Sequence, residues 1–429
     1  MLIFAIIICF ATAYAGYKQK NNIVNPISIY CLAWAFAMIM SAILIYFYGG
    51  IIVNDRVYVI IILSVVFFSM GSLFNAKMSQ GNAFSKTSDA YDSIKHKTII
   101  LLHIIAYFIV IPKMISSVQY LASGVGMYFI RHNLIVGDGT SEFTFNEMLK
   151  QVTVLPIFTA TIYVAIDELF HSRSKKNYRL LLLAIADIII YTVTYLGRFM
   201  IQNAFVFIVF VAISSKNISN WSPKVKRRIR RIVILSLVGA IVALVYITQN
   251  RSLGSGNGNG VIYTVVAYFG GPLKYFDTGI DVVKQDHILL YGSGLFSGLW
   301  DIILIPVQTI LGIDFLRPLE YVTMYNTPLR QIGASDLYLG AFGTVFLNMY
   351  LDGRLIGIII DSTILGIISS FFYNKFKTNS YRRYRVYYYT WIMFLFWSML
   401  YWDGNRMGSI LVFFYVMLMT TGRKLIRLK

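Results

Sequence analysis

Six arginines carry the clearest chemical signal in this sequence, because the charge pattern of the chain places them all on the outer side of a membrane. They are Arg131, Arg198, Arg251, Arg317, Arg330 and Arg354. A guanidinium keeps its charge and presents a planar fork of N–H donors that can hold two phosphate oxygens together. As a set, these arginines predict a site for an anion such as a diphosphate. Any single one could instead contact lipid phosphate at the membrane surface.

Groups that could accept a proton lie in the same outer segments. Histidine changes charge near neutral pH, which makes His132 and His287 candidates. Asp336 and Asp352 flank the end of a long loop, and Asp301 lies in an apolar stretch. The plainer interpretation is that each histidine is a solvated loop residue. Each aspartate would then cap a helix or pair with a lysine or arginine whose charged end reaches the membrane surface.

Two further aspartates, Asp187 and Asp361, fall inside apolar segments, where ionisable groups are costly and therefore functional candidates. The role of Asp187 is open. Gly353 and Gly357 form a small-xxx-small pair, which favours helix packing over catalysis.

Several kinds of site are not expected. The glycines at 292–298 lack a strand–helix unit and do not fit a dinucleotide fingerprint. No Asp-x-Asp pair occurs in the outer segments, so a metal-held nucleotide sugar is not expected, and we expect no cofactor. Cys9 and Cys31 both lie in apolar segments and offer neither a disulfide framework nor metal-type spacing.

The elements that must position these groups are transmembrane helices. Hydrophobic residues make up 57% of the 429-residue chain and charged residues only 13%, against roughly 25% in soluble proteins. Unbroken apolar runs at 57–74, 232–247 and 356–372 approach the length that crosses about 30 Å of hydrocarbon. Such runs must be helical, because every backbone polar group has to be paired within the bilayer. The long runs argue against an outer-membrane barrel.

The net charge of +19 orients the chain and does not indicate nucleic-acid binding. Six short basic segments hold 26 of the 38 Lys and Arg, with Asp89 and Asp92 as their only acids. The positive-inside rule assigns them to the cytoplasm. They are residues 18–22, 77–97, 171–179, 215–231, 374–385 and 422–429.

Alternating the sides predicts an all-α polytopic membrane protein with about 11 transmembrane helices in one membrane domain, residues 1–429. The expected spans are 2–17, 27–49, 56–75, 98–119, 151–170, 180–196, 199–214, 232–250, 353–373, 386–402 and 409–421. The first is a retained helix with its N-terminus outside, since it lacks the basic start of a secretory signal.

Two outer loops are too long to be simple turns, the first at 122–150 and the large one at 251–352. Long loops in compact proteins are usually functional. In the large loop, 261–276 and 295–316 are expected to be helices at the membrane interface. If 295–316 crosses instead, 337–351 must cross back, which gives 13 spans.

Four stretches of the outer segments resemble the bacterial oligosaccharide repeat-unit polymerases, the O-antigen polymerase or Wzy-type family. The likeness covers about residues 120–375 and depends on the order of the stretches. They are Gly124-Val125-Gly126-Met127-Tyr128-Phe129-Ile130-Arg131; Tyr195-Leu196-Gly197-Arg198-Phe199; Tyr268-Phe269-Gly270-Gly271-Pro272-Leu273-Lys274-Tyr275-Phe276-Asp277 with Tyr291-Gly292-Ser293-Gly294-Leu295-Phe296; and Gly343-Thr344 to Asn348, Tyr350, Asp352-Gly353 and Gly357.

The resemblance implies a metal-independent glycosyltransferase in the bacterial inner membrane, with its active site facing the periplasm or cell exterior. Its substrate would be oligosaccharide linked to undecaprenyl diphosphate, with membrane lipid and a chain-length regulator as further candidate partners. A growing glycan would be moved onto a new repeat unit. Fixed cations would stabilise the diphosphate leaving group. We expect Arg131, Arg198, Arg251, Arg317 and Arg330 to hold the diphosphate, and His287 or Asp336 to be the base.

Two alternatives stay open. An O-antigen ligase would share the architecture and chemistry but use a different acceptor. A flippase or exporter of lipid-linked oligosaccharide would also be basic and have many spans. It should show internal repeats, charges along its spans and short outer loops, which this sequence lacks.

Overall fold

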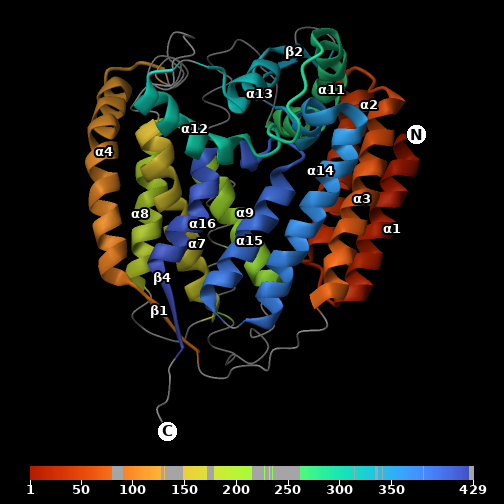
Figure 1. The fold of residues 1–429 in the computed structure, drawn as a ribbon. Helices are drawn as coiled ribbons and strands as arrows, with labels where there is room; N and C mark the ends of the chain where they lie inside the picture. Colours follow the sequence, from red (N-terminus) through yellow and green to blue (C-terminus); the bar gives the residue numbers. More distant parts are fainter. Residues whose placement is uncertain are drawn as a thin grey trace. The chain divides into compact units, whose positions relative to one another are not determined.

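The fold is given by a computed structural model that describes residues 1–79, 90–126, 130, 148–171, 178–214, 227, 231, 234, 261–313, 315–333, 337–340, 342–379 and 381–424. Within these residues the fold is helical, with two short strand pairs (Figure 1). The elements are α1 (Leu2–Lys20), α2 (Pro26–Tyr48), α3 (Asp55–Ser79), β1 (Ala90–Ile94), α4 (His96–Ala122), η2 (Lys150–Val154), α7 (Leu155–His171), α8 (Tyr178–Tyr195), α9 (Phe199–Ser214), α11 (Val261–Asp286), α12 (Ser297–Leu311), α13 (Pro318–Asn326), β2 (Arg330–Gln331), β3 (Tyr338–Leu339), α14 (Val345–Thr378), α15 (Arg382–Trp397), η5 (Asp403–Asn405), α16 (Met407–Met419) and β4 (Thr420–Lys424).

Seven helical segments of the described chain are long and apolar enough to cross a membrane. They are α1, α2, α3, α4, η2 with α7, α8 and α14. Each has at least 18 residues, which span about 27 Å at 1.5 Å per residue. The helical fold is as predicted, and by length and composition these seven segments support a polytopic membrane protein; they do not confirm the predicted count of 11.

The remaining four predicted spans are not among these seven segments: three form shorter helices and one lies outside the described residues. The segments expected at 199–214, 386–402 and 409–421 form the shorter helices α9, α15 and α16. The segment expected at 232–250 lies outside the described residues. In the large loop, 295–316 contains α12, whose 15 residues reach only about 22 Å, and 337–351 contains β3 and the first turns of α14. Neither stretch therefore forms a helix of spanning length.

The chain divides into two compact units, which are described separately. Unit 1 comprises residues 1–87, 262–379 and 391–410, and unit 2 the rest. In unit 1, helices α1, α2 and α3 pack together, and α14 lies along α3 (Figure 1). Close helix contact is achieved through small residues, since a Cβ on Gly71 would lie 2.2 Å from the Thr363 carbonyl oxygen.

Local sequence sets the ends of these helices. Asn25 caps α2 by accepting a hydrogen bond from the Ser28 N–H at 2.9 Å, and Pro26 occupies the first turn. The helix ends at Gly49, which adopts a left-handed conformation with φ 68°. Helix α13 also has a proline, Pro318, in its first turn, but here the side chain inside the helix is the acceptor: Glu320 accepts from the backbone N–H of the preceding Arg317 at 2.9 Å.

Helix α14 starts earlier than the predicted span at 353–373, because residues 345–352 are also helical. The helical path is interrupted at Gly353 and Arg354, so α14 has a short first arm and a long second arm. Gly357 permits this geometry, since a Cβ there would lie 2.2 Å from the Met349 carbonyl oxygen. Gly357 therefore allows close packing, as predicted, but between the two arms of α14 rather than between two separate helices.

Unit 2 is built around α4, α7, α8 and α9, with η2 leading into α7. Asp187 lies fully buried on α8, where its carboxylate contacts His103 Nε2 at 2.9 Å and accepts the Tyr107 hydroxyl at 2.8 Å, both from α4. Apolar association contributes little between helices in lipid, so polar contacts of this kind help to hold α4 to α8. The strands β1 and β4 also pair in this unit, antiparallel.

Candidate functional site

The break in α14 is the most unusual backbone feature of unit 1. Arg354 has φ 56° and ψ −132°, a conformation that L residues with a side chain rarely adopt. Backbone strain of this kind persists only where the surrounding structure holds it in place. The guanidinium carbon lies 5.4 Å from the centre of the Tyr350 ring. The strain therefore orients an arginine at the point where the helix changes course.

The Arg354 side chain is half-buried, and its Nη1 is fully buried without a hydrogen-bond partner among the described residues. Burying a charged donor without a partner removes its hydrogen bonds to water and replaces them with nothing, which destabilises the folded protein by about 1–3 kcal/mol or more. An anion that accepts from Nη1 would remove this cost. The geometry at Arg354 is that of a prepared anion-binding group.

Asp352, immediately before the break, fixes the loop that follows α11. Its carboxylate accepts hydrogen bonds from the backbone N–H groups of Gly294 at 2.7 Å and Leu295 at 2.8 Å. The Tyr291 N–H donates to the Asp352 carbonyl oxygen at 3.0 Å. A Cβ on Gly294 would lie 2.8 Å from the carboxylate, so the close approach requires glycine. Two stretches 57 residues apart, Tyr291–Phe296 and Asp352-Gly353, are thereby joined.

A tyrosine–carboxylate pair lies beside the same break. The Tyr325 hydroxyl, from α13, donates to Asp286 at the end of α11 at 2.7 Å. Burial and the Asp286 carboxylate raise the pKa of Tyr325 to about 12, while the positive charge of Arg354 acts in the opposite direction. Tyr325 is therefore a hydrogen-bond donor at neutral pH, within electrostatic range of Arg354.

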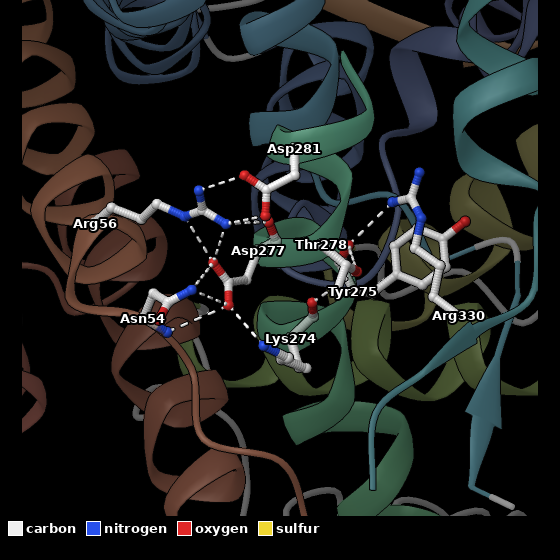
Figure 2. A network of polar contacts seen from close by, with 8 residues as sticks. All are labelled: Asn54, Arg56, Lys274, Tyr275, Asp277, Thr278, Asp281 and Arg330. Atoms are coloured by element: carbon white, nitrogen blue, oxygen red, sulfur yellow. Dashed lines mark hydrogen bonds and ion pairs between the residues drawn. The ribbon is translucent and has the colours of Figure 1, made fainter. Parts of the chain in front are cut away.

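The position of α11 is fixed by a polar network with the start of α3 (Figure 2). Asp277 is buried, and its carboxylate accepts from Arg56 Nε at 2.8 Å, Lys274 Nζ at 2.8 Å and Asn54 Nδ2 at 3.0 Å. Arg56 also forms a two-point ion pair with Asp281 at 2.6 and 2.7 Å. Burial would raise the pKa of Asp277, but the hydrogen bonds from Lys274, Arg56 and Asn54 hold it below its usual value.

Arg330 lies against another part of α11 and is committed to backbone contacts (Figure 2). Its guanidinium stacks on the Tyr275 ring at 4.2 Å and donates to the carbonyl oxygens of Tyr275 at 3.0 Å and Tyr325 at 2.8 Å. Burial lowers the pKa of Arg330. The side chain joins α11 to α13 and thereby supports the helix that carries Tyr325.

Arg317, at the start of α13, is held by two carboxylates. It donates to Glu320 at 2.7 Å and forms an ion pair with Asp301 of α12 at 3.3 Å. Burial raises the pKa of Asp301 to about 6, although the charge of Arg317 opposes this shift. Arg317 thus connects α12 and α13, and both of its acidic partners lie within unit 1.

The other predicted site residues have these positions. His287 follows α11 directly, is exposed, and has a left-handed backbone with φ 52°. Arg198 is half-buried in the hairpin between α8 and α9 of unit 2. Arg131, Arg251 and Asp336 lie outside the described residues. His287, Arg317 and Arg330 therefore belong to unit 1 together with Arg354.

Sequence reasoning counted Arg354 among the outer arginines but did not assign it to the diphosphate site. It also missed Tyr325, Asp286 and the partnership of His103 with Asp187. Only the last left a signal, since a histidine in one predicted span can neutralise an aspartate in another. The importance of Arg354 depends on a backbone break that no local pattern announces.

The comparisons with known proteins do not add to this description. No protein family, no curated protein and no solved structure matches the chain.

Proposed function

We propose that the protein is a membrane glycosyltransferase that polymerises oligosaccharide repeat units carried on undecaprenyl diphosphate. The observation that carries the proposal is the buried, unsatisfied Nη1 of Arg354 at the break in α14. It is supported by Asp352, which ties two of the stretches that resemble the polymerase family to one point of the fold. Arg354 lies within the last of these stretches, between Gly353 and Gly357.

The reaction requires charge stabilisation at the leaving group. A hydroxyl oxygen of the incoming repeat unit attacks the anomeric carbon of the growing glycan, and the bond from that carbon to the diphosphate oxygen breaks. The electron pair leaves with the undecaprenyl diphosphate, whose growing negative charge Arg354 would meet with its planar donors. The Tyr325 hydroxyl, which donates to Asp286, lies within electrostatic range of Arg354.

The proton of the attacking hydroxyl needs an acceptor. His287 stays our first candidate because it is exposed and follows Asp286, the partner of Tyr325. Asp336 is the second. A candidate base must come within hydrogen-bond reach of the hydroxyl, directly or through one water molecule. A ligase would use the same groups with a different acceptor.

The proposed placement is a bacterial inner membrane protein with 11 spans and its site on the periplasmic or outer side. The polar clusters of unit 1 support this placement, because α11, α12 and α13 lie in the segment that the charge pattern assigns to the outside. Helix α11 has apolar residues on one face and Lys274, Asp277 and Asp281 along another. Such a helix suits the membrane interface.

A deletion strain distinguishes this proposal from its rivals by the species that accumulates. Without a polymerase, single repeat units are still flipped and ligated, so acceptor lipid should carry one unit and the ladder of longer species should vanish. This readout applies to a pathway whose ligase accepts single units. Restoring the gene should restore the ladder, whereas the Arg354→Gln gene should give a shorter and weaker one.

Other outcomes would contradict the proposal. Long glycan accumulating on undecaprenyl diphosphate in the deletion strain would favour a ligase. Repeat units retained on the cytoplasmic leaflet would favour a flippase.

A further inference from the structure

Asp361 is a buried aspartate that the proposed function does not use. It lies on the second arm of α14, a helix long and apolar enough to cross a membrane, and is only 3% exposed. Its Oδ2 atom is fully buried and has no hydrogen-bond partner among the described residues. An ionised carboxylate in such surroundings is costly, because nothing there replaces its hydration. The state of this group therefore depends on what lies beside it.

The neighbour of Asp361 is a second carboxyl group, that of Asp352. The two side chains lie within hydrogen-bonding distance of each other, one from each arm of α14. The two arms pack closely enough to bring them together, since the Ser362 hydroxyl, next to Asp361, lies 3.6 Å from the sulfur of Met349 on the first arm. The pair is thus a product of the break in the helix.

Hydrogen bonds to two other helices fix the second arm at this level. The Ser362 hydroxyl lies 2.6 Å from the Ser64 hydroxyl of α3, which lies 2.8 Å from the Tyr30 hydroxyl of α2. All three side chains are buried. In an apolar environment such polar contacts between helices help to set their arrangement. They hold Asp361 beside Asp352.

Two carboxyl groups this close cannot both be ionised where water is excluded, because their charges repel strongly. One proton between them replaces the repulsion with a charge-assisted hydrogen bond. Asp352 accepts hydrogen bonds from the Gly294 and Leu295 N–H groups, which favours its ionised form. The buried Oδ2 of Asp361 has no donor among the described residues. The proton therefore belongs on Asp361.

We propose that Asp361 is a protonated carboxylic acid that donates a hydrogen bond to the Asp352 carboxylate and thereby positions Arg354. This bond joins the two arms across the break, and Asp352 in turn holds the backbone of Gly294 and Leu295. Arg354 follows Asp352 by two residues, so the bond supports its strained backbone. Asp361 is a positioning residue. Its effect on Arg354 in catalysis rests on the proposed function, whereas the shared proton does not.

Infrared spectroscopy of the purified full-length protein tests the proton without any substrate. A protonated carboxyl group has a C=O stretching band that is separate from the bands of carboxylates. The difference spectrum between the wild type and Asp361→Asn at neutral pH should contain this acid band. The control is Asp281→Asn, which removes an exposed carboxylate paired with Arg56 and should leave the acid band unchanged. A difference spectrum for Asp361→Asn without an acid band would overturn the proposal.

Two substitutions at the same position test the positioning role. The amide of Asp361→Asn can still donate to Asp352, so this variant should polymerise repeat units at close to the wild-type rate. Asp361→Ala removes the donor and should slow polymerisation about tenfold or more. Because this effect acts through Arg354, Asp361→Ala should slow an Arg354→Gln protein little further.

Equal losses in Asp361→Asn and Asp361→Ala, or the full loss from Asp361→Ala in the Arg354→Gln background, would overturn the positioning role. If the alanine variant does not fold in thermal melts, Asp361→Asn decides alone, and a loss of about tenfold in it would overturn the role. A wild type without polymerase activity would remove the proposed function and the effect on catalysis with it. The infrared result would still decide the shared proton.

Discussion

At the scale of single residues, the arginines of this protein divide by what they already contact. Arg330 and Arg317 donate to groups of the protein itself, to backbone carbonyl oxygens in one case and to carboxylates in the other. Buried Nη1 atoms of both Arg317 and Arg354 lack a hydrogen bond among the described residues, but that of Arg317 lies 3.3 Å from the Asp301 carboxylate, whereas no ion pair is found for Arg354 among these residues. The same side chain therefore serves structure at two positions and is available for a ligand at the third.

This difference predicts opposite phenotypes for two matched substitutions. Arg354→Gln should slow glycosyl transfer roughly ten- to a hundred-fold, corresponding to about 1.5–3 kcal/mol for a charged hydrogen bond, without lowering the thermal midpoint. Arg330→Gln should lower the midpoint, because it leaves the Tyr275 and Tyr325 carbonyl oxygens without their donors. Thermal melts in detergent and polymer length measured on the same preparations check both. Loss of stability in Arg354→Gln would place that arginine with the structural ones.

Asp301 predicts a pH dependence of stability. Its folded-state pKa of about 6 lies above the usual 3.8, so between pH 4 and 6 the folded chain binds a proton that the unfolded chain does not. The free energy of unfolding should therefore fall as the pH rises through this window, by at most about 3 kcal/mol. Asp277 and Asp281 have lowered pKa values, so both stay ionised in the folded chain across the window and their stabilisation is lost only at lower pH.

Melts of the wild type at pH 5 and pH 7.5 measure this effect. The wild type should be more stable at the lower pH, and Asp301→Asn should reduce the difference. An unchanged difference in Asp301→Asn would mean that other groups cause it.

At the scale of elements, the two arms of α14 determine where Arg354 lies. Gly357 must remain glycine for the arms to meet, since a Cβ would contact the Met349 carbonyl oxygen at 2.2 Å. Gly353 has φ −174°, an extended value open to any residue, and a Cβ there would meet nothing within 4 Å. The two glycines of the small-xxx-small pair are thus not equivalent.

Substituting each by alanine tests the arrangement. Gly357→Ala should destabilise the protein by about 1–3 kcal/mol and reduce polymerisation, because the first arm must move. Gly353→Ala should leave stability and activity close to wild type. Equal effects from both substitutions would show that the break does not depend on close approach at Gly357.

The sequence predicted which segments are helical better than it predicted where the helices begin and end. Long apolar runs identified all seven helical segments of spanning length, because burial in hydrocarbon leaves the backbone no other choice. The start of α14 at Val345 and the continuation of α11 to Asp286 were missed. Both extensions carry polar residues, such as Asn348 and Asp281, whose partners lie on other helices. Hydropathy contains no information about those partners.

The candidate site could be predicted only in part, for the same reason. Six arginines on the outer side indicated an anion site, and this inference needed only the type of the residues and their side of the membrane. Which arginine is free to bind depends on contacts such as that of Arg330 with Tyr275 of α11, a residue 55 positions earlier in the chain. Pairings over such separations are set by the folded arrangement rather than by spacing along the chain.

At the scale of the whole molecule, the account depends on which side of the membrane each segment faces. Reporter fusions at Asp89 and Ser219 should read cytoplasmic, and fusions at Asp138 and Asn257 should read external. Asn257 precedes α11, so a cytoplasmic signal there would put the unit 1 site on the wrong side for a polymerase that acts on flipped substrate.

Reconstitution with a defined substrate tests the central claim most directly. Purified protein is given a single synthetic repeat unit on undecaprenyl diphosphate, and the products are separated by length. The wild type should convert it to a ladder of lipid-linked glycans and release one undecaprenyl diphosphate per unit added, while Arg354→Gln should give roughly a tenth to a hundredth of the rate. A folded wild-type protein that leaves the repeat unit unchanged, or that lengthens it equally well without Arg354, would contradict the account.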